Sequence, residues 1–216
     1  KQAHKNGVTE FAEDSSGNAG ASMSAYAANI GMKAHIFTPS STPENKKNQI
    51  KIFGSELHLI DGPRENSTIE VKKFTNSTGI TYLSHNYNPF FIEGMKSFGE
   101  EVFNEFGPEI TDIVVPVGNG SLLIGAKKAY EELISLKKIT RMPKIHCIQV
   151  EGFSPIVKKL NNSKWEFDES SKTLAGGIAV TNPPRINQVL EAVKNSSGFG
   201  VEVSENEIIR WHRKVA

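Results

Sequence analysis

This sequence of 216 residues has a single cysteine, almost no net charge and no long apolar run. Its single cysteine, Cys147, cannot form a disulfide within the chain, and no secretory signal opens the sequence, so we expect a reducing, cytoplasmic setting. The 25 lysines and arginines against 24 aspartates and glutamates leave a net charge of +1, which argues against a nucleic-acid partner. No apolar stretch approaches the roughly 20 residues of a membrane-spanning helix, so no membrane partner is expected either.

The histidines also lack the spacing that is typical of metal ligands. His4, His35, His58, His146 and His212 form no ligand motif together with carboxylates or cysteines, so the sequence predicts no metal site. Cys147 lies inside an apolar strand-like run and is interpreted as a small buried hydrophobic residue.

His85 follows the end of another strand-like run. It either contacts a ligand near the expected cleft or is an ordinary loop histidine, and the sequence leaves both readings open.

Strand-like and helix-like segments alternate along the chain, whose 38% hydrophobic and 23% charged residues are typical of a folded protein. Strands are expected at residues 8–13, 34–38, 56–60, 80–83, 110–117, 144–150 and 200–203. Helices are expected at residues 19–30, 43–53, 66–75, 91–106, 122–136 and 184–194. This alternation predicts an α/β protein with largely parallel, doubly wound sheets. The asparagine- and proline-bearing stretch 86–89 separates two runs of alternation and predicts two domains, 1–91 and 92–216.

The two ends of the sequence both resemble interrupted helices. Residues 1–6 read as the tail of a helix that Gly7 ends, and residues 204–207 (SENE) form a capping box that begins another helix shortly before the last residue. We expect a portion of a longer protein, although an engineered start and a genuine terminal helix would give the same pattern.

A first candidate anion site lies in the turn Ser15–Gly20 (SSGNAG), between a strand and a helix that begins with small side chains. The unpaired N–H groups of such a turn point outward at the positive end of the helix dipole and can bind a carboxylate or phosphate. Ser15, Ser16 and Asn18 add hydroxyl and amide donors, which favours a carboxylate. In the alternative interpretation, Ser16 or Asn18 only caps its own helix.

A second candidate anion site follows the most continuous apolar strand. In Val117–Leu122 (VGNGSL), Gly118 and Gly120 allow positive φ and close approach of a ligand, and successive N–H groups can form a nest around a phosphate. The pattern matches neither the P-loop nor the dinucleotide-binding fingerprint. Two strand–turn–helix anion sites in one α/β chain predict a set of ligands with two separate negative groups.

Three motifs in this order, Glu13–Gly20 (EDSSGNAG), Val117–Leu122 (VGNGSL) and Leu174–Ala179 (LAGGIA), resemble those of the fold-type II pyridoxal-phosphate enzymes. The resemblance covers essentially the whole chain. It looks closest to the threonine synthases, because Asn119 and Thr181–Arg185 (TNPPR) both fit that group. It implies two doubly wound parallel-sheet domains of the tryptophan synthase beta type, here incomplete at both ends.

The resemblance also implies a cofactor, pyridoxal 5'-phosphate, and a role for each motif. Asn18 would donate a hydrogen bond to the phenolic oxygen of the cofactor, and the turn residues would hold the α-carboxylate of a small amino-acid substrate. The substrate-binding residues are then Ser15, Ser16, Asn18 and Ala19, and the cofactor phosphate would be bound by Gly118, Asn119, Gly120, Ser121 and Leu122. A homodimer is expected for the full-length protein.

Two departures from the family pattern qualify these roles. The family's Schiff-base lysine belongs upstream of the SSGN turn, and no matching context occurs here, so we expect no catalytic residue in this chain and no turnover by it alone. Phe91 stands where many threonine synthases have an arginine that grips the substrate phosphate. Three functions therefore stay open: a threonine synthase that converts O-phosphohomoserine and water to threonine and phosphate, a serine/threonine dehydratase, and a non-catalytic module that binds a phosphorylated ligand.

Overall fold

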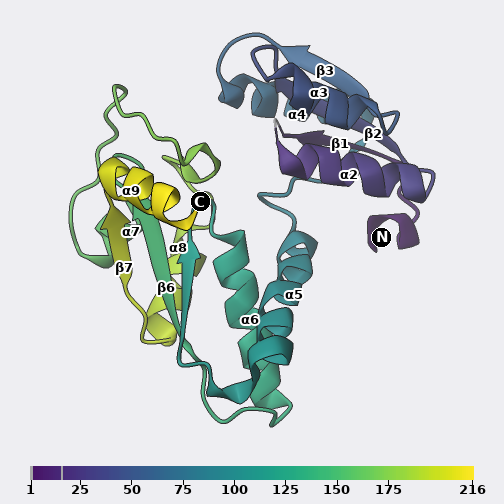
Figure 1. Ribbon diagram of the computed structural model, residues 1–216. Helices are drawn as coiled ribbons and strands as arrows, with labels where there is room; N and C mark the ends of the chain where they lie inside the picture. Colours follow the sequence, from purple (N-terminus) through teal and green to yellow (C-terminus); the bar gives the residue numbers. More distant parts are fainter. Residues whose placement is uncertain (1, 16) are drawn as a thin grey trace. The chain divides into compact units, whose positions relative to one another are not determined.

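The chain divides into two compact units, residues 1–88 and residues 89–216 (Figure 1). The computed structural model describes residues 2–15 and 17–216. Each unit is built on its own parallel sheet with its own hydrophobic core. The predicted fold class, two α/β domains with parallel sheets, is confirmed.

The first unit contains a four-stranded sheet in the order β3-β2-β1-β4, with every neighbouring pair parallel. Its strands are β1 (Glu10–Asp14), β2 (Lys33–Pro39), β3 (Glu56–Ile60) and β4 (Thr81–Tyr82). Its helices are α1 (Gln2–Lys5), α2 (Asn18–Asn29), α3 (Glu44–Lys51) and α4 (Arg64–Thr78).

Both faces of this sheet are covered, because successive residues of a strand point to opposite sides. Ile36 of β2 packs with Ile50 of α3 in one core cluster, where the close approach of α2 would bring a Cβ at Gly20 to 3.3 Å from each of them. The next residue, Phe37, packs with Val71 of α4 in a second cluster on the other face. The chain thus places α2 and α3 on one side of the sheet and α4 on the other.

The second unit contains a three-stranded parallel sheet in the order β5-β6-β7. Its strands are β5 (Asp112–Pro116), β6 (Lys144–Val150) and β7 (Gly200–Val203). Its helices are α5 (Pro89–Phe106), α6 (Ser121–Ser135), α7 (Pro155–Leu160), α8 (Ile186–Asn195) and α9 (Glu205–Val215), with 3-10 turns η1 (Gly107–Glu109) and η2 (Gly176–Ile178).

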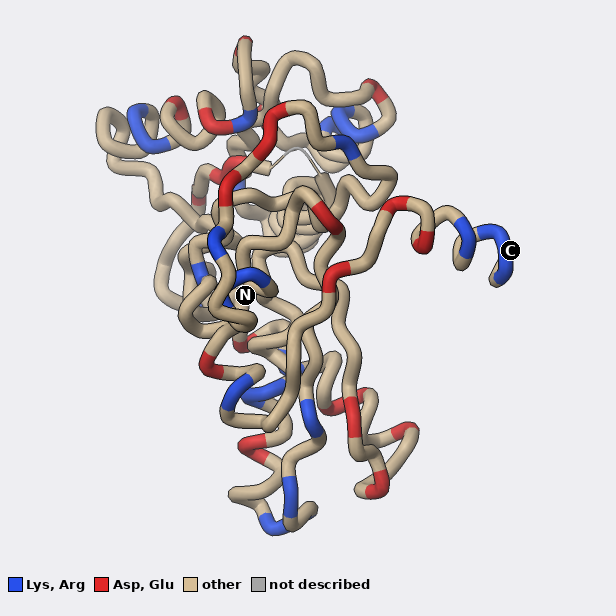
Figure 2. Tube along the Cα trace, turned by 90° about the vertical axis from the view of Figure 1, so that its left-hand side faces the viewer, with Lys and Arg blue, Asp and Glu red and all other residues tan. Residues whose placement is uncertain are grey.

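One core cluster holds this unit together. Ile113 and Val115 of β5 are buried with Leu123 of α6 and Val189 of α8, whereas Val114, which points to the opposite face of the sheet, is 62% exposed. Acidic and basic residues are interspersed along both units, with no long stretch of one sign (Figure 2). Among the described helices, none has both the length and the apolar character required to cross a bilayer.

Some boundaries of helices and strands differ from those predicted, because hydrogen bonds to other parts of the backbone determine them. The first strand begins at Glu10 rather than Val8, because the Val8 N–H donates to the Ala3 carbonyl (3.0 Å) and closes the end of α1. Helix α7 was not predicted, since six residues are too few to show a helical repeat. The predicted capping box is confirmed: Ser204 Oγ accepts from the Glu207 N–H, and the Glu207 carboxylate accepts from the Ser204 N–H.

Helices α5 and α6 pack so closely that two glycines are required at their contact. A Cβ added at Gly125 would lie 2.6 Å from the backbone of Met95, and one added at Gly99 would lie 2.7 Å from the Ala129 Cβ. Gly94, also on α5, has nothing within 4 Å of the same position.

We expect Gly125→Ala to destabilise the second unit by about 1–2 kcal/mol, because the added methyl group meets rigid backbone and the overpacking outweighs the gain in helix propensity. Gly94→Ala is the matched control and should stabilise the protein by up to about 1 kcal/mol, since the methyl group meets nothing. Denaturant unfolding of both variants measures the difference, and equal midpoints would contradict the packing described here.

Candidate functional site

The SSGN turn lies at the carboxyl end of β1, where the strand order of the first sheet reverses. The chain leaves β1 to form β2 on one side and later returns to place β4 on the other. In open α/β sheets this switch point is where ligands bind. Ser15 is buried, its N–H donates to the Phe37 carbonyl (3.1 Å), and its Oγ accepts from the Gly17 N–H (3.3 Å). Ser16, predicted to bind substrate, lies outside the described residues.

Asn18 begins α2, and its side chain contacts a neighbouring helix instead of capping its own. The Oδ1 atom of Asn18 accepts a hydrogen bond from Lys46 Nζ of α3 (3.0 Å). This contact orients the side-chain amide and leaves Nδ2 to donate. In the described part of the chain, the backbone N–H groups of Asn18 and Ala19 have no hydrogen-bond acceptor, as expected at a helix N-terminus that can receive an anion.

A buried acid–histidine pair supports the turn from β1 and the segment after β4. Glu13 is fully buried, and its carboxylate accepts hydrogen bonds from the His85 ring Nδ1 and from the His85 backbone N–H. Burial raises the pKa of the Glu13 carboxyl to about 7, although the hydrogen bonds from His85 oppose that shift. His85 is thus held by an internal partner beside the turn, which neither reading of the sequence foresaw.

The next residue, Asp14, connects β1 to β4 and α4. Its carboxylate accepts from Thr68 Oγ1 (2.5 Å) and from the Tyr82 hydroxyl, and its backbone carbonyl accepts from Arg64 Nη2 (3.1 Å). Burial and the hydrogen bond to Asp14 raise the pKa of the Tyr82 phenol, so Tyr82 stays a donor. Asp14 therefore fixes the end of β1, from which the SSGN turn departs.

The VGNGSL loop of the second unit presents a series of free backbone donors at the N-terminus of α6. Gly120, the residue before the helix, has φ +85°, in the left-handed region that favours glycine. Within the described residues, the N–H groups of Gly118 to Leu122 have no hydrogen-bond partner, and the first intrahelical bond runs from the Ile124 N–H to the Gly120 carbonyl (3.0 Å). Such a run of unpaired N–H groups at a helix N-terminus can form a nest for an anion.

The third motif packs directly against this loop. A Cβ added at Gly118 would lie 3.2 Å from Val180 Cγ2, 3.3 Å from Ile178 Cα and 3.4 Å from the Gly177 carbonyl oxygen. The glycine pair of LAGGIA thus forms one wall of the VGNGSL loop. The structure brings together two motifs that lie more than 50 residues apart in the sequence.

The buried Gln149 of β6 fixes the strand end next to the loop. Its Nε2 donates to the Val117 carbonyl (3.2 Å), while its Oε1 accepts from the N–H groups of Ile156 (2.9 Å) and Val157 (3.1 Å). The amide thereby ties β6 to the residue that precedes Gly118 and to the start of α7. No motif pointed to Gln149, whose role depends on contacts between distant segments.

Two other residues singled out in the sequence lie in the second unit. Cys147 is fully buried in β6, and burial raises the pKa of its thiol to about 12, which confirms the reading as a small hydrophobic residue. Phe91 lies in the first turn of α5 and is half-buried.

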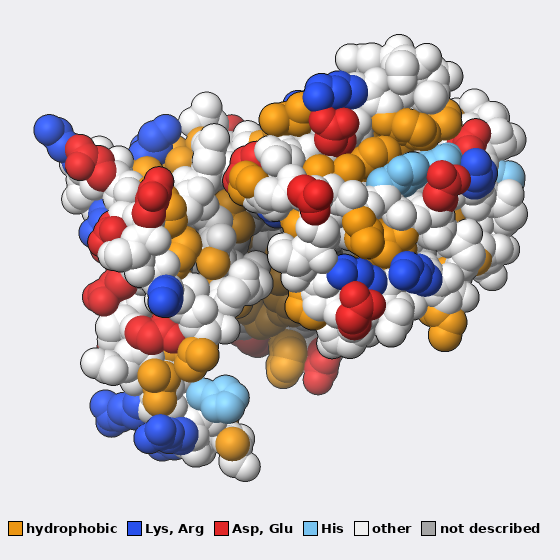
Figure 3. All heavy atoms as spheres, turned by 90° about the horizontal axis from the view of Figure 1, so that it is seen from above, with side chains coloured by type: hydrophobic (Ala, Val, Ile, Leu, Met, Phe, Trp, Pro, Cys, Tyr) orange, Lys and Arg blue, Asp and Glu red, His pale blue; other side chains and the backbone are white. Residues whose placement is uncertain are grey.

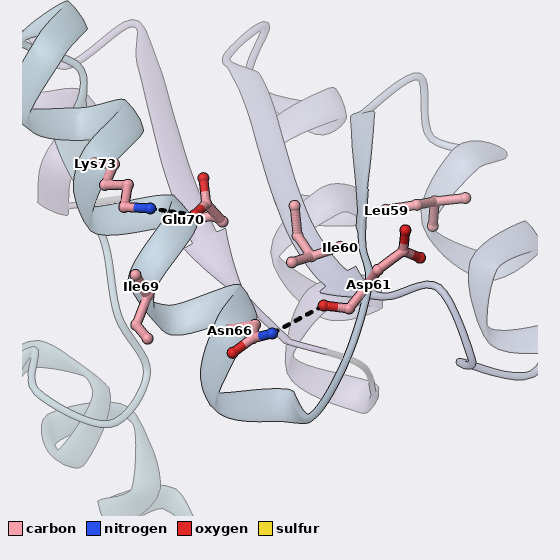
Figure 4. Close-up of a pocket in the computed structure, with 7 residues that line it drawn as sticks. All are labelled: Leu59, Ile60, Asp61, Asn66, Ile69, Glu70 and Lys73. Atoms are coloured by element: carbon pink, nitrogen blue, oxygen red, sulfur yellow. Dashed lines mark hydrogen bonds and ion pairs between the residues drawn. The ribbon is translucent and has the colours of Figure 1, made fainter.

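A pocket of the first unit lies between β3 and α4. Seven residues of β3 and α4 and the turn between them line it (Figure 4): Leu59, Ile60, Asp61, Asn66, Ile69, Glu70 and Lys73. Its polar groups bind each other, since Lys73 pairs with Glu70 (2.6 Å) and Asn66 Nδ2 donates to the Asp61 carbonyl (2.9 Å). None of the predicted site residues lines this pocket.

A family model described as pyridoxal-phosphate dependent enzyme matches residues 1–216. Threonine synthase of Methanocaldococcus jannaschii is 27% identical over 219 residues, covering 100% of this chain and 54% of that protein. Threonine synthase of Bacillus sp. (strain ULM1) is 30% identical over 203 residues, covering 94% of this chain and 55% of that protein. The chain thus spans about half the length of the curated relatives it matches.

Solved structures share the fold at lower identity. Maize serine racemase superimposes with a TM-score of 0.79 at 21% identity, covering 96% of this chain and 60% of that chain. The processed form of threonine deaminase isoform 2 from Solanum lycopersicum superimposes with a TM-score of 0.75 at 18% identity, covering 91% of this chain and 52% of that chain.

Replacing Glu13 by glutamine should change how stability depends on pH. A carboxyl with a pKa of about 7 in the folded protein and an ordinary value of 4.5 when unfolded contributes stability below pH 4.5 and loses that contribution as the pH rises to about 7. The free energy of unfolding of the native protein, relative to Glu13→Gln, should fall by up to about 3 kcal/mol across this interval.

Chemical denaturation of both proteins at several pH values measures the effect, with Glu105→Gln on the exposed side of α5 as the control. Parallel profiles for the native protein and Glu13→Gln would show that the buried carboxyl does not titrate in this interval.

Proposed function

The chain belongs to the family of pyridoxal-phosphate-dependent enzymes, and from that premise we propose that it supplies the substrate turn and the phosphate loop of an enzyme of the threonine synthase type. The observation that carries the proposal is the run of unpaired N–H groups from Gly118 to Leu122, at a glycine-shaped helix N-terminus. Pyridoxal 5'-phosphate is the cofactor of the family, and its phosphate group matches this nest in charge and in the type of donor.

The loop residues bind the phosphate through backbone atoms in this proposal. Gly118, Asn119, Gly120, Ser121 and Leu122 each offer an N–H group, and the Ser121 hydroxyl adds a donor. The α6 dipole favours the negative charge. Because Gly118 lies against the LAGGIA segment and Gly120 adopts a left-handed conformation, the chain holds the nest in shape before any ligand arrives.

The SSGN turn holds the amino-acid end of the substrate. Ser15 and Ser16 offer hydroxyl groups, and the N–H groups of Asn18 and Ala19 can bind the α-carboxylate at the N-terminus of α2. Lys46 engages Oδ1 of Asn18, so the Nδ2 group is free to donate to the phenolic oxygen of the cofactor. When bound, pyridoxal phosphate supplies an electron sink for negative charge at the substrate Cα. The chain's own residues orient the substrate for that chemistry.

The specific reaction proposed is the conversion of O-phosphohomoserine and water to threonine and phosphate. It is supported by curated threonine synthases at 27–30% identity over nearly the whole chain. Asn119 in the loop and the TNPPR segment, residues 181–185, also fit that group. The lysine that carries the cofactor is expected in the longer protein, which we propose to act as a homodimer.

Phe91 favours a second candidate, β-elimination from serine or threonine with release of ammonia and a keto acid. A phenyl ring cannot bind the phosphate of O-phosphohomoserine as an arginine at that position would. A small hydroxy amino acid carries no such phosphate and needs no cation there.

Gly118→Val should abolish retention of pyridoxal phosphate by the full-length enzyme. The branched side chain would press against Val180 and the Gly177–Ile178 backbone and displace the N–H groups of the nest. Gly176→Ala is the control, because nothing lies within 4 Å of its added Cβ. Absorbance of the bound cofactor after gel filtration provides the measurement, and unchanged retention by Gly118→Val would refute the nest assignment.

Substrate assays on the full-length enzyme distinguish the two reactions. Release of phosphate and formation of threonine from O-phosphohomoserine, without keto acid from threonine, is the expected result for a threonine synthase. Keto acid from serine or threonine, with no phosphate released from O-phosphohomoserine, would establish the β-elimination instead. If neither reaction occurs while the cofactor is retained, both assignments fail and a binding module is the remaining reading.

A further inference from the structure

Two histidines and a glutamate meet on the α4 side of the first sheet, the face opposite α2. His35 lies on β2, and Glu56 and His58 lie two residues apart on the neighbouring strand β3. The register pairs His35 with Glu56, so all three side chains rise from the same face. Phe37 stacks on the His58 ring (centroids 4.2 Å apart, 6° between planes), and Phe74 of α4 packs against both histidines.

The candidate ligand atoms of these three side chains lie close to one another. His35 Nδ1 lies 3.1 Å from His58 Nε2 and 3.5 Å from Oε2 of Glu56, and His58 Nε2 lies 3.5 Å from the other carboxylate oxygen, Oε1. One ligand atom from each of the three residues lies within 4.8 Å of the other two. A tetrahedral zinc ion with bonds of about 2.0–2.2 Å separates its ligand atoms by about 3.3–3.5 Å. The separation of the two nitrogens is therefore within a few tenths of an ångström of that between two corners of a zinc coordination sphere, and the Glu56 carboxylate lies close enough to both for one of its oxygens to occupy a third.

We propose that His35 Nδ1, His58 Nε2 and a Glu56 carboxylate oxygen bind a divalent transition-metal ion of the zinc class. Two imidazoles with one carboxylate form a donor set suited to such an ion, and water would complete the fourth position. The side chain of Glu56 is half-exposed and that of His58 is 25% exposed, so the ion has a path of entry. Acidic and basic side chains lie beside the histidine patch at the right of the space-filling view (Figure 3).

Glu10 orients the His35 ring so that it can bind a metal ion. Its carboxylate lies 2.7 Å from Nε2 of His35, which is 3% exposed, so this nitrogen carries the proton and Nδ1 keeps its lone pair toward Glu56 and His58. Metal-binding histidines almost always donate their second ring nitrogen to a carboxylate or carbonyl in this way.

Lys33 is the cation that the metal ion must displace. Its ammonium lies 2.9 Å from Glu10 and 3.4 Å from Glu56. Because the Lys33 side chain is 57% exposed, it can release Glu56 to the ion and keep Glu10. Removing this amine should therefore tighten metal binding, an effect that a purely structural hydrogen-bond cluster would not produce.

The test is a titration of the metal-free chain with Zn²⁺ by calorimetry and with Co²⁺ by visible absorption. We expect one equivalent of Zn²⁺ to bind and Co²⁺ to give the intense bands of a tetrahedral site. His58→Phe keeps the stacked ring but removes the ligand nitrogen and should abolish the Co²⁺ bands. Glu10→Gln should weaken binding by about 10- to 100-fold, as changes to hydrogen-bond partners of ligands do. Lys33→Met should strengthen it.

His212→Gln, an exposed histidine on α9, is the control and should bind Zn²⁺ as the native chain does. If His58→Phe fails to fold by circular dichroism, Glu56→Gln at its half-exposed position tests the same ligand set. The proposal is overturned if the native chain binds no Zn²⁺ or Co²⁺, or if the folded ligand variants bind either ion as tightly as the native chain. None of these measurements involves pyridoxal phosphate, so the result is independent of the proposed function.

Discussion

Unpaired backbone N–H groups at the ends of parallel strands are the feature on which the functional interpretation of this protein depends. A helix leaves its first N–H groups without intrahelical partners, and in both units the turn that precedes a helix follows the end of a parallel strand. In the first unit the turn lies where the strand order reverses beside β1. In the second unit, glycine 120 in a left-handed conformation opens the helix and leaves five consecutive residues with free N–H groups among those described. These donors carry no formal charge, which agrees with a protein whose net charge is close to zero.

The fold could be predicted from the sequence because its local signals agree with one another. The strands Glu56–Ile60, Lys144–Val150 and Gly200–Val203 have the expected boundaries, since apolar runs between turn residues determine them. The six-residue helix α7 and the late start of β1 could not be predicted. The first is too short for periodicity, and the second depends on a hydrogen bond back to α1.

The motifs of the candidate site were visible in the sequence, but the groups that support them were not. The signal for Glu13 and Asp14 was two acidic residues at the end of an otherwise buried strand, which requires buried partners. Their partners, His85 and Tyr82, lie about 70 residues away and come close only through the pairing of β4 with β1. The same holds for His35 and His58, whose separation of 23 residues matches no linear metal motif although they lie on adjacent strands. Contacts across a parallel sheet have no fixed spacing in the sequence.

Val189 on α8 shapes the loop at which we propose that the cofactor phosphate binds. A side chain at Gly120 would collide with Val189, which is fully buried, so α8 packs closely against the loop. A larger side chain at position 189 would displace the loop, and a smaller one would leave a cavity that the loop could relax into. Under that proposal, an apolar position with no polar group of its own governs the affinity for a charged cofactor.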